Sequence, residues 1–156
     1  MGAYQKVIVG TDGSDTSMLA VDKAAAIAGN ASAELVIVCA YEPQRPEEVN
    51  AAAEALGADS YQVVGSAPAE SVLRDAADRA RGVGATKIET VAVEGDPVDA
   101  LTDEALRRGV DLLVVGNRGL NSLAGRLLGS VPANITHKAN CDVLVVHTTG
   151  KGVPPE

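Results

Sequence analysis

Two glycine-rich segments of the sequence contain residue types that could bind a phosphate group. The first is Gly10-Thr11-Asp12-Gly13-Ser14; the second is Gly116-Asn117-Arg118-Gly119, followed after nine intervening residues by Gly129-Ser130. Glycines let the backbone approach a bound group closely, and the unpaired amides at a helix N-terminus carry a partial positive charge that favours anions. We therefore expect backbone amides or a hydroxyl to contact phosphates, with room for a ribose beside them. The residues expected to do so are Gly116 for the ribose and Gly119, Gly129, Ser130 and Val131 for the phosphates.

A purely structural interpretation of these glycines stays open. They could only form turns and open a helix, and a lone GxxG does not decide between the two interpretations. Other phosphate-binding loops are absent, because the sequence has no GxxxxGK[ST] and no GxGxxG follows a predicted strand. A receiver domain needs a lysine after its last strand, where this chain has His147-Thr148-Thr149. The sequence thus indicates neither a P-loop nor a dinucleotide-binding fold.

The elements that would position these segments follow from the apolar pattern. Four short aliphatic runs, at residues 7–9, 35–38, 112–115 and 143–146, predict strands buried on both faces. A fifth run, at residues 88–93, alternates apolar with polar residues, as a strand nearer a sheet edge would. Four helices are expected between them: from Ser14 or Asp15 to Gly29, from Ser66 to Gly82 or Gly84, from Asp96 and Pro97 to Gly109, and from Gly129-Ser130 to just before Cys141.

Strands that alternate with helices imply right-handed crossovers and an α/β fold, an open five-stranded parallel sheet with helices on both faces. Ligands of such sheets bind beyond the carboxyl ends of the strands, where the strand order reverses. We expect one domain over residues 1–147 and a disordered tail at residues 148–156. Residues 42–65 are too many for an ordinary connection and predict a mobile excursion that is partly helical.

Composition restricts the class of partner. The net charge of −8, with three Tyr and no Phe or Trp, argues against nucleic acid, which basic and aromatic side chains bind. A small anion stays compatible, because backbone amides bind it without positive side chains. No apolar run is long enough to span a membrane and no signal-peptide pattern occurs, so we expect no membrane association and a cytoplasmic protein. Cys39 and Cys141 lack metal-site spacing and are expected to be buried, inert thiols.

The second glycine-rich segment resembles a known motif. Gly116-Asn117-Arg118-Gly119, nine residues, then Gly129-Ser130 is similar to the G-x-x-G-(nine)-G-[S/T] motif of ATP-binding universal stress proteins. Residues 7–14 resemble the family's first strand and loop, Gly95-Asp96-Pro97 the entry to its third helix, and residues 129–146 its last helix and strand. The resemblance extends from Tyr4 to His147. It implies the strand order 3-2-1-4-5 and a Rossmann-like fold of the adenine nucleotide alpha hydrolase type.

The resemblance also implies roles for individual residues around bound ATP, with Mg²⁺ on its phosphates. Asp12 would approach the nucleotide or its metal, with Gly10 and Thr11 lining the same site. Ala40, after the second strand, would offer backbone groups to adenine. The family pattern places Gly116 and Gly119 at the ribose and phosphate, and Gly129, Ser130 and Val131 on the phosphates. Arg118 and Arg126 could reach phosphates or lie solvated at the surface.

The implied function is that of an ATP-binding protein with a regulatory or sensing role in the stress response, and not an enzyme. Asp12 would support slow hydrolysis at most, because the catalytic residues of kinases and P-loop enzymes are missing. Cyclic AMP, which some family members bind, is the alternative ligand, for a sink or a sensor. An adenylating enzyme is less favoured, because the loop from Thr11 to Ser17 lacks paired glycines. The apolar strand from Val143 to Val146 is expected to pair across a two-fold axis, as in relatives, to give a homodimer.

Overall fold

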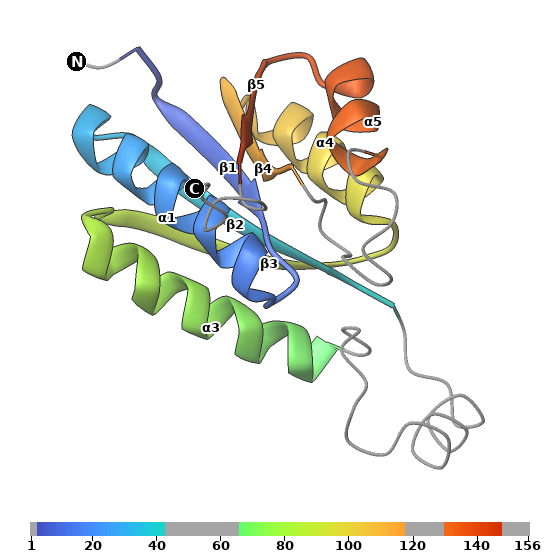
Figure 1. The fold of residues 1–156 in the computed structure, drawn as a ribbon, viewed down its shortest axis with the longest axis horizontal. Coiled ribbons are helices and arrows are strands. Elements are labelled where there is room, and N and C mark those ends of the chain that lie inside the picture. The colour runs from blue at the N-terminus through green and yellow to red at the C-terminus, as the bar shows by residue number, and fades with distance from the viewer. Residues whose placement is uncertain (1–2, 43–65, 118–129, 148–156) are drawn as a thin grey trace, which may run out of the picture.

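The computed structural model describes residues 3–42, 66–117 and 130–147 (Figure 1). The predicted tail at residues 148–156 and almost all of the predicted excursion at residues 42–65 lie outside this part of the chain. Neighbouring strands are parallel, in the order β3-β2-β1-β4-β5, which confirms the expected sheet. In chain order the elements are β1 (Lys6–Gly10), α1 (Asp15–Ala31), β2 (Glu34–Tyr41), α3 (Ser66–Val83), β3 (Lys87–Glu94), α4 (Pro97–Arg108), β4 (Leu112–Gly116), α5 (Ser130–Lys138) and β5 (Asp142–Val146).

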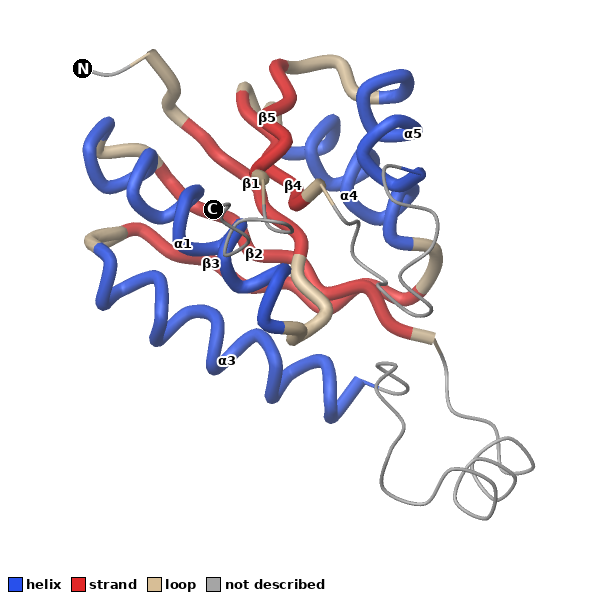
Figure 2. The backbone as a smooth tube through the Cα atoms, in the orientation of Figure 1, coloured by secondary structure: helices blue, strands red, loops and turns tan. Residues whose placement is uncertain are grey.

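The helices cover both faces of the sheet. Helices α1 and α3 lie on one face and α4 and α5 on the other, as the ribbon and the backbone tube both show (Figures 1 and 2). Successive side chains of a strand point to opposite faces. Val7 and Val9 of β1 therefore join the core under α1 and α3, and Ile8 joins the core under α4. The continuous apolar strands thus supply two aliphatic cores.

Side-chain caps fix where two helices begin. Ser14 caps α1, because its Oγ accepts a hydrogen bond of 3.2 Å from the backbone N–H of Ser17. Asp96 caps α4 through bonds of 3.0 and 3.1 Å from the N–H groups of Val98 and Asp99. Gly109 ends α4 in the left-handed conformation, with φ of 67°. These predicted boundaries are confirmed.

The predicted end of α1 at Gly29 is wrong. The helix continues to Ala31, and Ser32 follows it in the left-handed conformation, with φ of 55°. The N–H of Ser32 caps the helix by donating to the carbonyls of Ala28 and Gly29. Gly29 is needed for a different reason. A Cβ at this position would lie 2.7 Å from the carbonyl oxygen of Gly84, so the glycine permits close approach of the chain that follows α3.

Replacing Gly29 with alanine should therefore destabilise the protein. We expect a loss of about 1–3 kcal/mol in the free energy of unfolding from the forced contact, against a helix-propensity gain of about 1 kcal/mol. Gly82→Ala is the matched control, because a Cβ added at that helical glycine would meet no other atom within 4 Å. Urea unfolding of both variants measures the difference. A Gly29→Ala protein as stable as Gly82→Ala would contradict the packing argument.

The length of β2 differs from the prediction. The sequence predicts a strand over residues 35–38, whereas β2 extends to Tyr41, which pairs with Glu94 of the edge strand β3. Gly95 continues this pairing, since its N–H donates to the Tyr41 carbonyl at 2.9 Å. Ala40, expected after the strand, therefore lies within it. The weakly apolar residues Cys39, Ala40 and Tyr41 continue the strand, and backbone pairing with β3 extends over them.

None of the helices in residues 3–42, 66–117 and 130–147 combines the length and the apolar character needed to cross a membrane.

Candidate functional site

The carboxyl ends of β1, β2 and β4 meet at one edge of the sheet. Gly10 ends β1, and Gly116 ends β4. Gly10 lies opposite Val38 of β2, so Ala40 lies two residues further along β2, beyond the end of β1. The strand order reverses between β1 and β4, where parallel sheets bind their ligands.

The register of β4 completes this edge. Val9 of β1 lies opposite Val114, so Gly116 is level with Thr11. The structure thus brings five of the expected residues to the same edge: Gly10, Thr11, Asp12, Ala40 and Gly116.

The remaining expected residues belong to the chain that follows β4. Ser130 and Val131 are the first two residues of α5, which confirms that a helix begins at this point. Arg118, Gly119 and Gly129 lie outside the described residues.

The backbone of Ala40 faces the space beyond the end of β1. The Val38 carbonyl accepts a 2.9 Å hydrogen bond from the N–H of Thr11, so Val38 directs its backbone groups toward β1. Backbone groups two residues apart in a strand point the same way, so Ala40 also directs its N–H and C=O to that side. Beyond Thr11, however, β1 has turned toward α1. A donor and an acceptor of the Ala40 backbone thus lack a strand partner among the described residues.

A tight turn presents Asp12 at the same edge. Asp12 Oδ1 accepts a hydrogen bond of 3.0 Å from the N–H of Ser14, and Gly13 has φ of 88°, a conformation that glycine adopts without strain. Asp12 is half-buried. One carboxylate oxygen therefore holds the turn, and Oδ2 bonds to none of the residues that the structure describes.

Two buried hydroxyls lie under this turn. Thr11 Oγ1 and Ser17 Oγ are 2.7 Å apart, and the two residues are only 1% and 3% exposed. Thr11 Oγ1 also accepts from the N–H of Gly13 at 3.1 Å, and Ser17 Oγ donates to the Ser14 carbonyl at 2.9 Å. The motif predicted Thr11 as a residue lining the site, but it did not predict Ser17.

Cys39 lies beside Ala40 and is fully buried, as expected. Burial raises the pKa of its thiol to about 12, and the negative charge of Asp12 adds to the increase. The expectation of burial is wrong for Cys141, which is only partly buried because it precedes the edge strand β5. The pKa of Cys141 is also raised, first by desolvation and then by Asp142 and Asp111.

The raised pKa of Cys39 predicts a loss of stability in alkali. The unfolded thiol ionises above pH 9.0 while the folded thiol stays protonated to about pH 12, so the folded state binds more protons in this window. Stability should therefore fall as pH rises, by at most about 1.4 kcal/mol per pH unit from this group. Cys39→Ala should remove the loss of stability that comes from this thiol, and Cys141→Ala should leave most of that loss in place. Urea unfolding from about pH 8 to about pH 11 compares the two; parallel curves for both variants would contradict the prediction.

Candidate catalytic and metal-binding groups are few in the part of the chain that the structure describes. His137 and His147 are both exposed. No cluster of three or more His, Cys, Asp or Glu side chains in the described ranges is arranged to hold a metal ion. The described part of this edge offers a ligand backbone groups and carboxylates, of which Asp12 directly follows β1 and Thr11.

The sequence model of the Universal stress protein family matches residues 3–147 of the chain. The chain belongs to the universal stress protein family. This confirms the family that the glycine motif indicated. Together with the parallel sheet order, the family explains the Rossmann-like α/β architecture.

This universal stress protein is similar to several relatives and solved structures. Universal stress protein Rv1636 of Mycobacterium tuberculosis strain H37Rv is 54% identical over 149 residues, which is 96% of this chain and 100% of the relative. A solved universal stress protein in complex with cAMP is 48% identical, with a TM-score of 0.73 over 95% of this chain and 100% of the other. The Archaeoglobus fulgidus universal stress protein in complex with dAMP is 20% identical, with a TM-score of 0.66 over 93% and 99%, and is similar in fold.

Proposed function

We propose that this universal stress protein binds an adenine nucleotide at the edge formed by β1, β2 and β4, and that it acts by binding and release in the stress response. The observation that carries the proposal is the solved complex of cAMP with a universal stress protein 48% identical to this chain over nearly its whole length. The site residues predicted from sequence remain proposals: Gly10, Thr11, Asp12, Ala40, Gly116, Arg118, Gly119, Gly129, Ser130 and Val131.

The geometry at Ala40 supports adenine as the base. An N–H and a C=O that project from one residue form a donor–acceptor pair, and adenine offers the complement, the acceptor N1 beside the donor amino group at N6. The backbone of Ala40 provides this pair on the side where β1 ends. A guanine carries an N1–H and a carbonyl at these positions and would oppose donor to donor.

Asp12 fits the base or the ribose better than the phosphates. Its Oδ1 is occupied by the N–H of Ser14. A carboxylate accepts hydrogen bonds from amino or hydroxyl groups and repels a phosphate unless a cation lies between them. Contact with a phosphate would therefore need Mg²⁺, which one carboxylate and phosphate oxygens can hold together.

The charge of the described part of this edge favours cyclic AMP over ATP. The described strand ends and the turns that follow them carry Asp12, Glu42, Glu94 and Asp96 and neither Lys nor Arg, whereas Arg118 and Arg126 lie in the chain that follows β4, outside the described residues. Each additional negative charge on a ligand raises the repulsion from these carboxylates, so a single cyclic phosphate costs less than a triphosphate. ATP with Mg²⁺, the ligand expected from the motif, is the second candidate, since the metal offsets part of this charge.

Two measurements test the proposal. Mass spectrometry identifies the nucleotide released when a fresh preparation is denatured, and calorimetry compares cAMP, ATP, and ATP with Mg²⁺. We expect cAMP to bind at least about tenfold more tightly than ATP, a difference of about 1.4 kcal/mol. Equal or weaker binding of cAMP would make ATP the ligand. Failure of both nucleotides to bind would overturn the proposed function.

Hydrolysis and adenylation are ranked below binding. Asp12 is the one carboxylate that the motif places near the phosphates, and its Oδ1 already holds the turn. A positioned base with a free carboxylate would be needed for efficient turnover. Release of phosphate or pyrophosphate from ATP above the uncatalysed background would restore an enzymatic role. A cytoplasmic location and a domain spanning residues 1–147 stay predictions from the sequence.

We further propose a homodimer through β5. This strand lies at the sheet edge, Val145 is 40% exposed, and Val143 and Leu144 are half-buried. An apolar edge strand leaves backbone donors and acceptors open to pairing with another chain. Sedimentation at micromolar concentration tests the proposal, because a monomer there would refute it.

A further inference from the structure

We infer that Ser17, which lies outside the expected nucleotide contacts, is a positioning residue that fixes the Asp12 turn through its buried hydroxyl. The inference rests on the proposed function, since the turn is part of the edge assigned to the nucleotide. Ser17 lies in the first turn of α1 and is 3% exposed, on the face that packs against the sheet.

One arrangement of protons satisfies the contacts that the two buried hydroxyls make with oxygen and nitrogen atoms; Thr11 Oγ1 also lies 4.0 Å from Met18 Sδ, a weaker acceptor. Ser17 Oγ lies 2.9 Å from the Ser14 carbonyl, which only accepts, so Ser17 directs its one proton there. Thr11 must then be the donor in the 2.7 Å contact between the two hydroxyls. The Thr11 oxygen in turn accepts the N–H of Gly13 at 3.1 Å. The hydrogen bonds therefore run in one direction, from Gly13 through Thr11 and Ser17 to Ser14.

This chain of hydrogen bonds holds the turn on both sides of Asp12. Thr11 precedes Asp12, and Gly13 and Ser14 follow it. The N–H of Asp12 itself points at Ser17 Oγ, at 3.4 Å. One side chain of α1 thereby fixes the backbone positions of the whole turn. Removing it would take the acceptor from the Asp12 N–H and leave the buried Thr11 hydroxyl with only the distant Met18 Sδ to donate to, which is costlier than the loss of an exposed hydrogen bond.

The opposite side of the turn is closed by α3. A Cβ at Gly13 would lie 3.0 Å from Cγ2 of Val72, so this helix lies directly beside the turn. Val72 therefore limits movement of the turn toward α3 when the hydrogen bonds of the Ser17 hydroxyl are lost. Loss of that hydroxyl should therefore displace Asp12 along the edge and weaken nucleotide binding.

The test compares Ser17→Ala with Thr102→Val. Thr102 is the matched control, because its hydroxyl is also buried, at 7% exposure, and donates to the Val98 carbonyl at 2.8 Å within α4. Calorimetry with cAMP and with ATP gives the dissociation constants, and urea unfolding gives the stability of each variant. Ser17→Ala should weaken the binding of the better ligand at least about tenfold, whereas Thr102→Val should lose stability with affinity changed by less than about twofold.

Amide hydrogen exchange of the nucleotide-free protein separates this inference from the proposed function. Ser17→Ala should speed exchange at the N–H of Gly13 relative to the wild type. This N–H donates to the Thr11 hydroxyl, and the Thr11 hydroxyl loses its partner Ser17 in the variant. Unchanged exchange would refute the positioning role even if no nucleotide binds. If the wild type binds but Ser17→Ala binds equally well, the inference fails and the proposed function stands.

A second pair of variants keeps the test valid if Ser17→Ala does not fold. Thr11→Val removes the Thr11 hydroxyl from this series of hydrogen bonds and preserves the shape of the side chain. Thr11→Ser keeps the hydroxyl and removes a methyl group. The positioning role requires Thr11→Ser to lose less affinity than Thr11→Val, and the reverse order would overturn it.

Discussion

Replacing Gly129 with valine is expected to abolish nucleotide binding. Gly129 directly precedes Ser130, where α5 begins, and it is the motif glycine that we propose lets a phosphate approach the helix amides. A valine side chain would occupy the space that the phosphate needs. We expect at least about a 100-fold loss of affinity, which corresponds to about 2.7 kcal/mol. Calorimetry with cAMP and ATP measures the loss, and the variant should also be purified without nucleotide.

Gly82→Val is the control for this substitution. It introduces the same side chain at a glycine of α3 with no other atom within 4 Å of the added Cβ. This variant should bind nucleotide as the wild type does. Thermal unfolding of both variants checks that the fold is retained. Wild-type affinity in a folded Gly129→Val protein would mean that the nucleotide does not contact the start of α5.

Much of the fold could be predicted because separate signals coincide on the same residues. For α4, a capping Asp96, a Pro97 at the first helical position and a Gly109 after the last turn all mark the same helix, and the structure has it there. The end of α1 could not be predicted in this way. Its cap is Ser32 in a left-handed conformation, which few residues other than glycine adopt, while the nearby Gly29 serves packing.

The candidate site was predictable to the extent that it depends on strand ends. Gly10 and Gly116 directly follow apolar runs, and Asp12 comes two residues after Gly10, so their common edge follows from a parallel sheet. That the Ala40 backbone has no partner in β1 was not visible in the sequence, because it depends on β2 extending further than β1.

The burial of Ser17 is weakly indicated by the sequence, although the glycine motif does not include this residue. Ser17 shares the helical spacing of the buried positions Ala20, Val21, Ala24 and Ala28, so it is a polar residue on an apolar face. Such a residue needs a hydrogen-bond partner from inside the protein. The partner, Thr11, belongs to the adjoining loop, and only the folded geometry shows that their hydroxyls meet.

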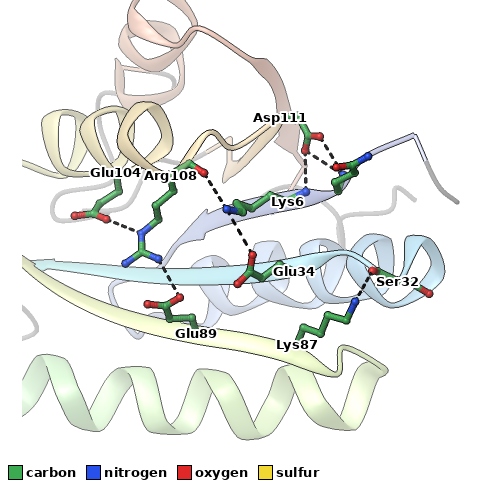
Figure 3. Close-up of polar contacts among 9 residues, drawn as sticks. Lys6, Ser32, Glu34, Lys87, Glu89, Glu104, Arg108 and Asp111 are labelled. Carbon is green, nitrogen blue, oxygen red and sulfur yellow. Dashed lines mark hydrogen bonds and ion pairs between the residues drawn. The ribbon is translucent and has the colours of Figure 1, made fainter.

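The second large effect is expected at the opposite edge of the sheet, on removal of Arg108. Figure 3 shows Arg108 of α4 between Glu104 and Glu89. Its Nε donates to Glu104 Oε1 at 2.8 Å, and its Nη1 lies 3.0 Å from Glu89 Oε1. These carboxylates raise the pKa of Arg108, Glu104 more than Glu89. The Glu104 side chain is only 5% exposed, so Arg108→Met would leave a buried carboxylate with Arg107 alone.

Arg108→Met should lower the free energy of unfolding by about 2–3 kcal/mol, somewhat less than removal of one partner from a fully buried pair. Urea unfolding measures the loss. Arg81→Met is the matched control, because Arg81 and Asp78 are 61% and 71% exposed. Such a surface pair contributes at most about 1 kcal/mol, so this variant should remain close to the wild type.

A double variant decides why Arg108 stabilises the fold. If the cost of Arg108→Met comes from the uncompensated charge of Glu104, then adding Glu104→Met removes that charge and should restore part of the stability. If Arg108 acts mainly through the apolar stem of its side chain, the second substitution should not help. Nucleotide affinity should be unchanged in every one of these variants, because α4 ends at the amino-terminal edge of the sheet, with the whole length of the strands between Arg108 and Asp12. A loss of affinity together with a loss of stability would instead show that the two edges are coupled.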